Sequence, residues 1–284
     1  MGAAALAARV PPHAFFLVSA LFHYLGPAFA VLLFARVAPL GVAWLRIASA
    51  AAVFALWRRP WRFFRALDAR ARLLVVLLGG VLASMNACFY IAIDRLPLAT
   101  VGAIEFLGPI ALAAAGMRTA RNWVALGLAA TGVYVLTGVR LAGEPIGFLF
   151  AFANCALFVM YIVLGHRLAA GGGAQGIDRL GLAMLIAMVV AIPIGIRDAA
   201  PALVQPTLLA AGIGVGISSS VIPYVCDQLA MARLSRATFA LLLSLLPATA
   251  AVVGIVVLRQ IPSPAEVAGV ALVIFGVAVH REPR

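Results

Sequence analysis

Ionisable side chains are rare inside the long apolar stretches of this 284-residue sequence, and Glu105 is the first of them. A charged side chain is costly in hydrocarbon, so one that is retained there usually has a function. At helical spacing, Val101, Glu105 and Pro109 share one face, and Pro109 frees a backbone carbonyl nearby. We therefore expect Glu105 to bind an ammonium group or a proton. The alternative is a packing role, with the carboxylate bonded to Arg46 or to backbone.

Asp227 and Arg46 are the next two charged candidates. Asp227 falls on one helical face with Ser220 and Tyr224, close to the end of its predicted helix. It is interpreted either as a solvated end residue or as a member of a gate ion pair. Arg46 is the one basic side chain well inside an apolar stretch. It has the geometry to hold a carboxylate through two hydrogen bonds, but structural pairing with Glu105 or Asp227 is the favoured interpretation.

Polar and aromatic residues also share helical faces in two other stretches. They are Asn86 and Tyr90 in one stretch, and Asn154, Phe158 and Tyr161 in another. Amide groups beside aromatic walls are typical of a small-molecule pocket. The alternative is hydrogen bonding between helices, worth about 0.6–2 kcal/mol. His23 is the only histidine inside an apolar stretch, and we interpret it as a hydrogen-bonded packing residue rather than a proton relay.

The elements that position these residues are membrane-spanning helices. The chain is 65% hydrophobic and 11% charged, against about 25% charged residues in globular proteins. Apolar runs of bilayer-spanning length recur along the chain, and in lipid such runs must be helical. Ten spans are predicted, at residues 12–35, 38–57, 73–93, 98–117, 122–139, 146–165, 180–196, 208–229, 237–258 and 263–280.

The arginines predict the direction of these spans. The sequence has no lysine, and its 21 basic residues are all arginine. With the N-terminus inside, fifteen of them fall on the cytoplasmic side and five on the outer side. Cytoplasmic connections carry an excess of basic residues. We therefore expect a multi-pass protein of a bacterial-type inner membrane with both termini in the cytoplasm.

An internal repeat relates the two halves of the chain. The pattern Ala-x-x-Arg-Leu-x-x-Ala-Thr, followed eight residues later by proline, runs from Ala92 to Pro109 and again from Ala230 to Pro247. Pro109 and Pro247 are predicted to break their helices at equivalent points. Five helices per repeat is an odd number, so the second repeat enters the membrane in the opposite sense. Inverted repeats, here residues 1–142 and 143–284, are typical of secondary transporters.

Other function classes find little support in the sequence. The basic residues lie between spans rather than on a soluble face, which argues against nucleic-acid binding. No catalytic residues, metal ligands or cofactor motif are identified, so neither an enzyme nor a metalloprotein is expected. Cys88, Cys155 and Cys226 lie in spans and predict no disulfides. A polytopic membrane enzyme and a channel remain as alternatives of a different class.

The sequence resembles the drug/metabolite transporter superfamily, in its ten-helix EamA-type branch. The motifs that carry the resemblance are Pro39 to Arg46, Glu105-Phe-Leu-Gly-Pro109 after Arg95-Leu-Pro97, Ser219 to Asp227, and Leu241 to Pro247. They are similar to motifs of the threonine/homoserine exporters, and aromatic amino-acid exporters share the architecture. The resemblance implies a cavity built mainly by the third, fourth, eighth and ninth helices and gated by the first, second, sixth and seventh.

Together these observations predict an exporter of amino acids or related small metabolites that works by alternating access, as a monomer or homodimer in the lipid bilayer. Export of drugs or lipophilic cations is the alternative within transporters, because Glu105 and the aromatic residues suit a cation equally well.

Overall fold

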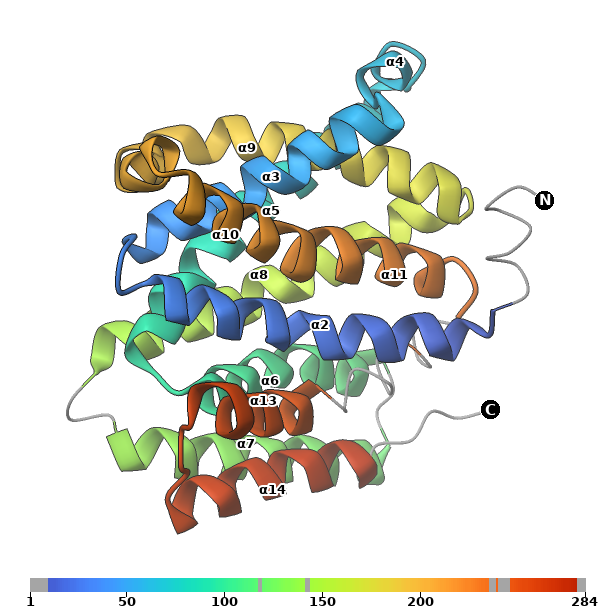
Figure 1. The fold of residues 1–284 in the computed structure, drawn as a ribbon. Coiled ribbons are helices and arrows are strands. Elements are labelled where there is room, and N and C mark those ends of the chain that lie inside the picture. Colours follow the sequence, from blue (N-terminus) through green and yellow to red (C-terminus); the bar gives the residue numbers. More distant parts are fainter. Residues whose placement is uncertain (1–9, 117–118, 141–143, 235–238, 240–245, 280–284) are drawn as a thin grey trace.

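The computed structural model describes residues 10–116, 119–140, 144–234, 239 and 246–279, and every regular element in these ranges is helical (Figure 1). In the first half these are α2 (Pro12–Leu33), α3 (Pro39–Arg58), the short α4 (Trp61–Phe64), α5 (Ala69–Arg95), α6 (Leu98–Gly116) and α7 (Ala120–Arg140). The five predicted spans of this half each coincide with one of the five long helices. Only α4 falls in a segment that was predicted as a connection.

The second half contains α8 (Pro145–Ala169), α9 (Gly173–Val204), α10 (Pro206–Gly216), the π-helical turn η1 (Ile217–Val221), α11 (Ile222–Met231), α13 (Leu246–Leu258) and α14 (Pro264–Val279). The predicted span at residues 208–229 coincides with the continuous helical stretch Pro206–Met231, within which η1 is a π-helical turn that the sequence did not predict. The ninth predicted span begins at residue 237, and most of its first part lies outside the described residues.

Proline marks the start of many of these helices. Pro12, Pro39, Pro145, Pro206 and Pro264 are first helical residues, where the missing N–H has no intrahelical partner to lose. At the start of α14, Ser263 and Glu266 form a reciprocal capping box: the Ser263 N–H donates to Glu266 Oε2 over 2.8 Å, and the Glu266 N–H donates to Ser263 Oγ over 3.3 Å.

Six helical segments of the described ranges are long and apolar enough to cross a membrane. They are α2, α3, α5, α8, α9 and the continuous stretch Pro206–Met231. Large apolar side chains such as Leu56, Val204 and Val256 are exposed on the outside of the bundle, as a lipid-facing surface requires. The chain is an all-helical membrane protein.

Close contact between helices depends on glycine at several crossings. Where α7 packs on α14, a Cβ on Gly132 would approach the Gly269 carbonyl oxygen to 2.5 Å, and one on Gly276 would approach that of Ala125 to 2.7 Å. These crossings agree with a packing role for glycine. Gly127 does not share that role, because no neighbouring atom lies within 4 Å of its Cβ position.

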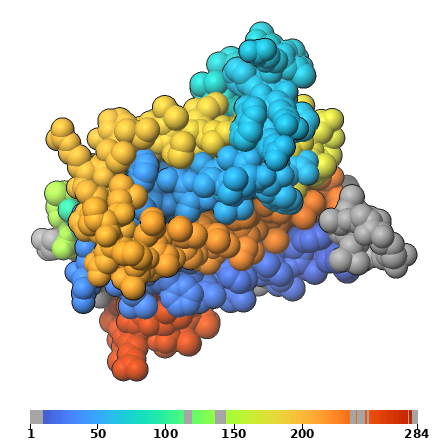
Figure 2. Space-filling view, turned by 45° about the horizontal axis from the view of Figure 1, so that its top comes forward, coloured from blue at the N-terminus to red at the C-terminus, as the bar shows by residue number. Residues whose placement is uncertain are grey.

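The beginning of α2 and the end of α14 lie at the same end of the bundle (Figure 1). The end of α3, α4, the start of α9 and the end of α11 lie there too. This end holds Arg58, Arg59, Arg62, Arg65, Arg179 and Arg233, and it is called the arginine-rich end below. In the space-filling view α4 projects from it, while α3, α11 and α2 lie side by side along the bundle (Figure 2).

Candidate functional site

Glu105 lies midway along α6 and is 2% exposed. Its Oε2 accepts a hydrogen bond from the Tyr24 hydroxyl over 2.9 Å, and its Oε1 accepts one from Asn154 Nδ2 over 2.9 Å. His23 Nε2 lies 3.8 Å from Oε2. The packing alternative foresaw bonds to Arg46 or to backbone, but the side-chain partners come instead from α2 and α8. Because the oxygens of this carboxylate accept hydrogen bonds from neutral donors, a cationic ligand can take the place of those donors.

Asp227 forms a second buried acidic site, on α11, and is 4% exposed. Ser19 Oγ donates to its Oδ1 over 2.5 Å, and the Tyr161 hydroxyl donates to its Oδ2 over 3.0 Å. In the described part of the chain no basic group lies within ion-pair distance of Asp227. Its burial shows that the interpretation of Asp227 as a solvated end residue was wrong, and the alternative of a gate ion pair is not formed among the described residues.

The two carboxylates share one pattern of support. Each receives one hydroxyl from α2 (Tyr24 or Ser19) and one donor from α8 (Asn154 or Tyr161). Ser19 and Tyr24 are five residues apart, which corresponds to about 7.5 Å along a helix. The first and sixth predicted spans therefore hold both acids, at two levels of the bundle.

Arg46 of α3 binds the π-helical turn rather than a carboxylate. Its Nε donates to Ser220 Oγ over 2.7 Å, and its Nη2 donates to the Ser219 carbonyl over 2.6 Å and to the Tyr224 hydroxyl over 3.4 Å. Its guanidinium also lies 5.6 Å from the ring centroid of Tyr90. The predicted pairing with Glu105 or Asp227 was wrong. The π-turn alters the backbone hydrogen-bond pattern of the helix at this point. The Ser219 carbonyl within it accepts its hydrogen bond from Arg46.

A small closed cavity of about 10 Å³ lies between these groups. Its lining residues come from six helices and are His23, Arg46, Met85, Asn86, Phe89, Glu105, Asn154 and Tyr224. A single water molecule needs about 10–15 Å³ of such space. The site is therefore closed, and no amino acid fits until its walls separate.

Several buried acceptors beside this cavity have no protein partner. Asn86 Oδ1 and Asn154 Oδ1 make no hydrogen bond within the described ranges, and the Tyr90 hydroxyl reaches no partner at full hydrogen-bond geometry although Arg46 and Ser219 lie near it. The amide nitrogen of Asn86 is occupied by the Leu82 carbonyl, at 2.7 Å. An unpaired buried polar group costs about 1–3 kcal/mol, so a ligand that donates hydrogen bonds to these atoms would recover that energy.

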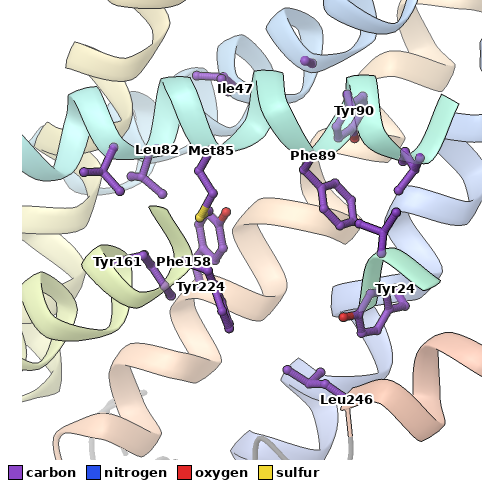
Figure 3. Packing of buried hydrophobic residues seen from close by; sticks show 14 of the residues in the cluster. Tyr24, Ile47, Leu82, Met85, Phe89, Tyr90, Phe158, Tyr161, Tyr224 and Leu246 are labelled. Carbon is purple, nitrogen blue, oxygen red and sulfur yellow. The ribbon is translucent and has the colours of Figure 1, made fainter. Parts of the chain in front are cut away.

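Aromatic rings fill the space between the two acidic sites. Phe158 stacks on Tyr161 at 5.9 Å between centroids, and Tyr161 lies 5.4 Å from Tyr224. His23 lies 5.8 Å from Phe158. Figure 3 shows Met85, Phe158, Tyr161 and Tyr224 gathered between α5, α8 and α11. This aromatic layer separates Asp227 from the closed cavity.

A larger cavity of about 570 Å³ opens at the opposite end of the bundle from the arginine-rich end. It is lined by residues of both halves, including Ile93, Thr100, Ala251 and Glu266. Gly102 closes the way to Glu105: a Cβ there would lie 2.8 Å from Ala250 Cβ and 2.9 Å from the Tyr24 hydroxyl. The layer of Tyr24, Gly102 and Ala250 therefore separates this cavity from the closed one.

The resemblance placed the cavity mainly on the third, fourth, eighth and ninth helices. In this closed state α2, α3 and α8, the first, second and sixth predicted spans, also supply wall residues. Ser19 and Tyr24 were not selected from the sequence, although Ser19 lies one helical turn before His23. Pro109 lies inside α6, which continues to Gly116, so the helix break predicted at Pro109 is not seen. Pro247 is the second residue of α13, and the residues directly before that helix lie outside the described ranges.

Comparisons with known proteins identify the class of this protein. Residues 145–280 match the EamA-like transporter family. The chain is 30% identical over 271 residues to the threonine/homoserine exporter RhtA of Salmonella typhimurium strain SL1344, covering 91% of this chain and 89% of that protein. It is 31% identical over 252 residues to RhtA of Escherichia coli strain K12, covering 88% and 84%. These matches make the protein a multi-pass membrane transporter and not an enzyme, as the sequence predicted. It belongs to the EamA-like transporter family of the drug/metabolite transporter superfamily.

A solved crystal structure has the same fold. It superposes with a TM-score of 0.60 at 20% sequence identity and covers 94% of this chain and 96% of its own. This likeness defines the fold alone.

Proposed function

We propose that this protein exports amino acids of the threonine/homoserine or aromatic type, together with related small metabolites. The observation that carries the proposal is the closed cavity, because a buried carboxylate, Glu105, and a buried guanidinium, Arg46, border the same space. A zwitterionic amino acid has one group of each opposite charge. The names of the relatives, which are threonine/homoserine exporters, support the same substrate class.

The residues of the cavity divide into three roles. Glu105 takes the ammonium group, replacing its bonds from Tyr24 and Asn154. Arg46 takes the carboxylate, for which its planar fork is suited. The unpaired oxygens of Asn86 and Asn154 accept hydrogen bonds from the remaining donors of the substrate. Phe158 and Tyr161 provide the aromatic wall toward the arginine-rich end.

Alternating access follows from two inverted repeats, residues 1–142 and 143–284. The helix pairings support this arrangement. The first predicted span, α2, packs on α11 and α13, and the sixth, α8, packs on α5 and α6. Each span of the first repeat corresponds to the span five places later in the second repeat. Replacing α2, α11 and α13 by their counterparts α8, α5 and α6 turns the first set of packed pairs into the second. Spans α3 and α9, and α7 and α14, pack on their own counterparts.

The arginine-rich end faces the cytoplasm of a bacterial inner membrane in this proposal, with both termini inside. Reporter fusions at each end of the full chain provide the test. A fusion active only in the cytoplasm is expected to be active at both ends. Activity at one end only would contradict the inverted repeat, because two repeats of five spans make ten spans, and ten spans return the chain to the side on which it started.

The closed state has the 570 Å³ cavity on its outer side as an exit vestibule. Release requires Tyr24 to leave the layer that it forms with Gly102 and Ala250, and that movement also breaks its bond to Glu105. Loss of the Tyr24 bond therefore accompanies opening of the route outward.

The transport experiment uses purified protein in liposomes loaded with labelled L-threonine, L-homoserine or L-phenylalanine. Exchange is measured against each unlabelled amino acid and against tetraphenylphosphonium, with and without a pH gradient. We expect amino-acid exchange in the wild type and weaker exchange, with a raised KM, in Glu105→Gln. Exchange of tetraphenylphosphonium with no amino-acid exchange would replace the proposal with export of lipophilic cations.

A further inference from the structure

Asp227 lies outside the closed cavity, and the proposed export cycle above gives it no task. Nonetheless it is a buried carboxylate whose hydrogen-bond partners are two neutral hydroxyls. Burial of a carboxylate is costly, and hydroxyl donors offset only part of that cost. His23 interacts electrostatically with Asp227 but lies outside ion-pair distance of it, with its Nε2 3.8 Å from Glu105 instead. A protein of this kind keeps such a group where a cationic ligand arrives to pair with it.

The position of Asp227 relative to Glu105 can be followed along two helices. On α2, its partner Ser19 comes five residues before Tyr24, the partner of Glu105. On α8, its partner Tyr161 comes seven residues after Asn154, also a partner of Glu105. These spacings correspond to about 7.5 Å and 10 Å along a helix. Since α2 begins and α8 ends at the arginine-rich end, both place Asp227 nearer that end (Figure 1).

Gln228 continues the polar line beyond Asp227. It is 0% exposed, and neither its Oε1 nor its Nε2 has a hydrogen-bond partner in the described ranges. Its Oε1 lies 2.5 Å from the Cβ position of Gly176 on α9, and its Nε2 lies 3.6 Å from that of Gly165 on α8, one helical turn after Tyr161. The Gln228 amide therefore lies where α8, α9 and α11 meet, with both of its ends available to a ligand.

The aromatic layer makes this a separate site. Tyr161, which bonds Asp227, stacks on Phe158 and lies 5.4 Å between centroids from Tyr224, which lines the closed cavity. Figure 3 shows these three rings together. Arg46, which the proposed function assigns to the substrate carboxylate, is bound on the other side of this layer to the π-turn. Within the described residues, the Asp227 level therefore offers a carboxylate and an amide, and no guanidinium bonds Asp227.

We infer that Asp227, Ser19, Tyr161 and Gln228 form a second binding site, which takes the protonated amine of a solute arriving from the arginine-rich end. The inference rests on the proposed function for the direction of transport and for the amine. A solute held there has its ammonium group on Asp227 and its other end toward the arginine-rich end. Parting of the aromatic layer then passes the ammonium group from Asp227 to Glu105.

The test places a single cysteine beside Asp227. Cys88, Cys155 and Cys226 are replaced by alanine, and Ser19→Cys is added, so that the Asp227 carboxylate stays in place. Two membrane-impermeant thiol reagents of similar size are used, the cationic MTSET and the anionic MTSES. They are applied to oriented vesicles from one side at a time, and the rate of labelling is measured.

We expect labelling from the arginine-rich side. Adding Asp227→Asn should lower the ratio of MTSET to MTSES rates by about ten-fold or more, since the reagents differ by two charges a few ångströms from the carboxylate. Asp68→Asn is the matched control, because Asp68 is an exposed N-cap of α5 that asparagine replaces well. It should leave the ratio unchanged. Size-exclusion chromatography checks that each variant is folded.

Protection defines the ligand class. Ethanolamine, an amine without a carboxylate, and L-threonine should both slow labelling, whereas acetate should not. An unchanged rate ratio in Asp227→Asn, labelling from the opposite side only, no labelling from either side, or protection by acetate alone would each overturn the inference. Failure of the proposed function gives a different result. The wild-type protein would then exchange no amino acid in liposomes, while ethanolamine would still protect the thiol of the Ser19→Cys variant from MTSET.

Discussion

The Tyr24 hydroxyl donates a 2.9 Å hydrogen bond to Glu105, and the same hydroxyl lies against the position of Gly102. One side chain thus connects the proposed ammonium site with the layer of Tyr24, Gly102 and Ala250, which is the proposed barrier to release. The occupancy of Glu105 and the state of that barrier are coupled through a single bond.

Replacement of Glu105 by glutamine keeps the shape of the side chain and removes its charge. A hydrogen bond to a charged group is worth about 1.5–3 kcal/mol, so the KM for exchange should rise by about ten- to a hundred-fold. Exchange kinetics in liposomes measure this. Glu144→Gln is the matched control, because Glu144 caps α8 without a side-chain bond and its variant should transport normally. Normal KM in Glu105→Gln would remove Glu105 from the site.

Tyr24→Phe removes the donor to Glu105 without emptying the space that the ring fills. The lost bond should lower stability by about 1 kcal/mol, and exchange should change several-fold because the barrier no longer depends on Glu105. Thermal unfolding in detergent and exchange rates are the measurements. Tyr134→Phe is a suitable control, since Tyr134 is exposed on α7. Identical behaviour of the two variants would contradict the coupling.

Arg46→Lys keeps the positive charge but replaces the guanidinium fork. A lysine cannot bond Ser220 Oγ and the Ser219 carbonyl in the same geometry, and we expect a loss of about 2–4 kcal/mol in stability from the partly unpaired buried charge. The unfolding midpoint in detergent measures it. Arg36→Lys, at an exposed position after α2, should leave the midpoint within error. Equal midpoints for the two variants would contradict the role of the π-turn as the partner of Arg46.

Gly26→Ala tests the contact between α2 and the π-turn. An added Cβ would clash with the Cβ and Cα of Ser219, so α2 would have to move away from the residue whose carbonyl binds Arg46. We expect a loss of about 1–3 kcal/mol, as for other overpacked sites, together with slower exchange. Gly80→Ala meets nothing within 4 Å and should stabilise α5 by about 0.5–1 kcal/mol. Wild-type stability and exchange in Gly26→Ala would show that α2 can move away from the π-turn without cost.

Much of the fold follows from the sequence, because a bilayer leaves the backbone few choices. Long apolar runs must be helices, so the bounds of α2, α3, α5 and α8 were predicted to within a few residues. The same reasoning selected Glu105, Arg46 and Asp227, since charge inside such runs is conspicuous. The π-turn was missed because its residues, Ile217 to Val221, have ordinary helical character and only the packing of Gly26 and Arg46 against them distinguishes the turn.

What the sequence alone determined is which residues lie in the membrane and which of them carry charge, because hydrophobicity and length fix both. Which of those residues meet was decided by tertiary structure. Helical spacing shows the face that a side chain occupies on its own helix, but not which neighbouring helix that face touches. Arg46 was expected to bind an acid and binds a backbone carbonyl, whereas Glu105 and Asp227 are held by hydroxyl and amide groups from α2 and α8. These partners lie between 49 and 208 residues apart in the chain, a separation that no local pattern can report.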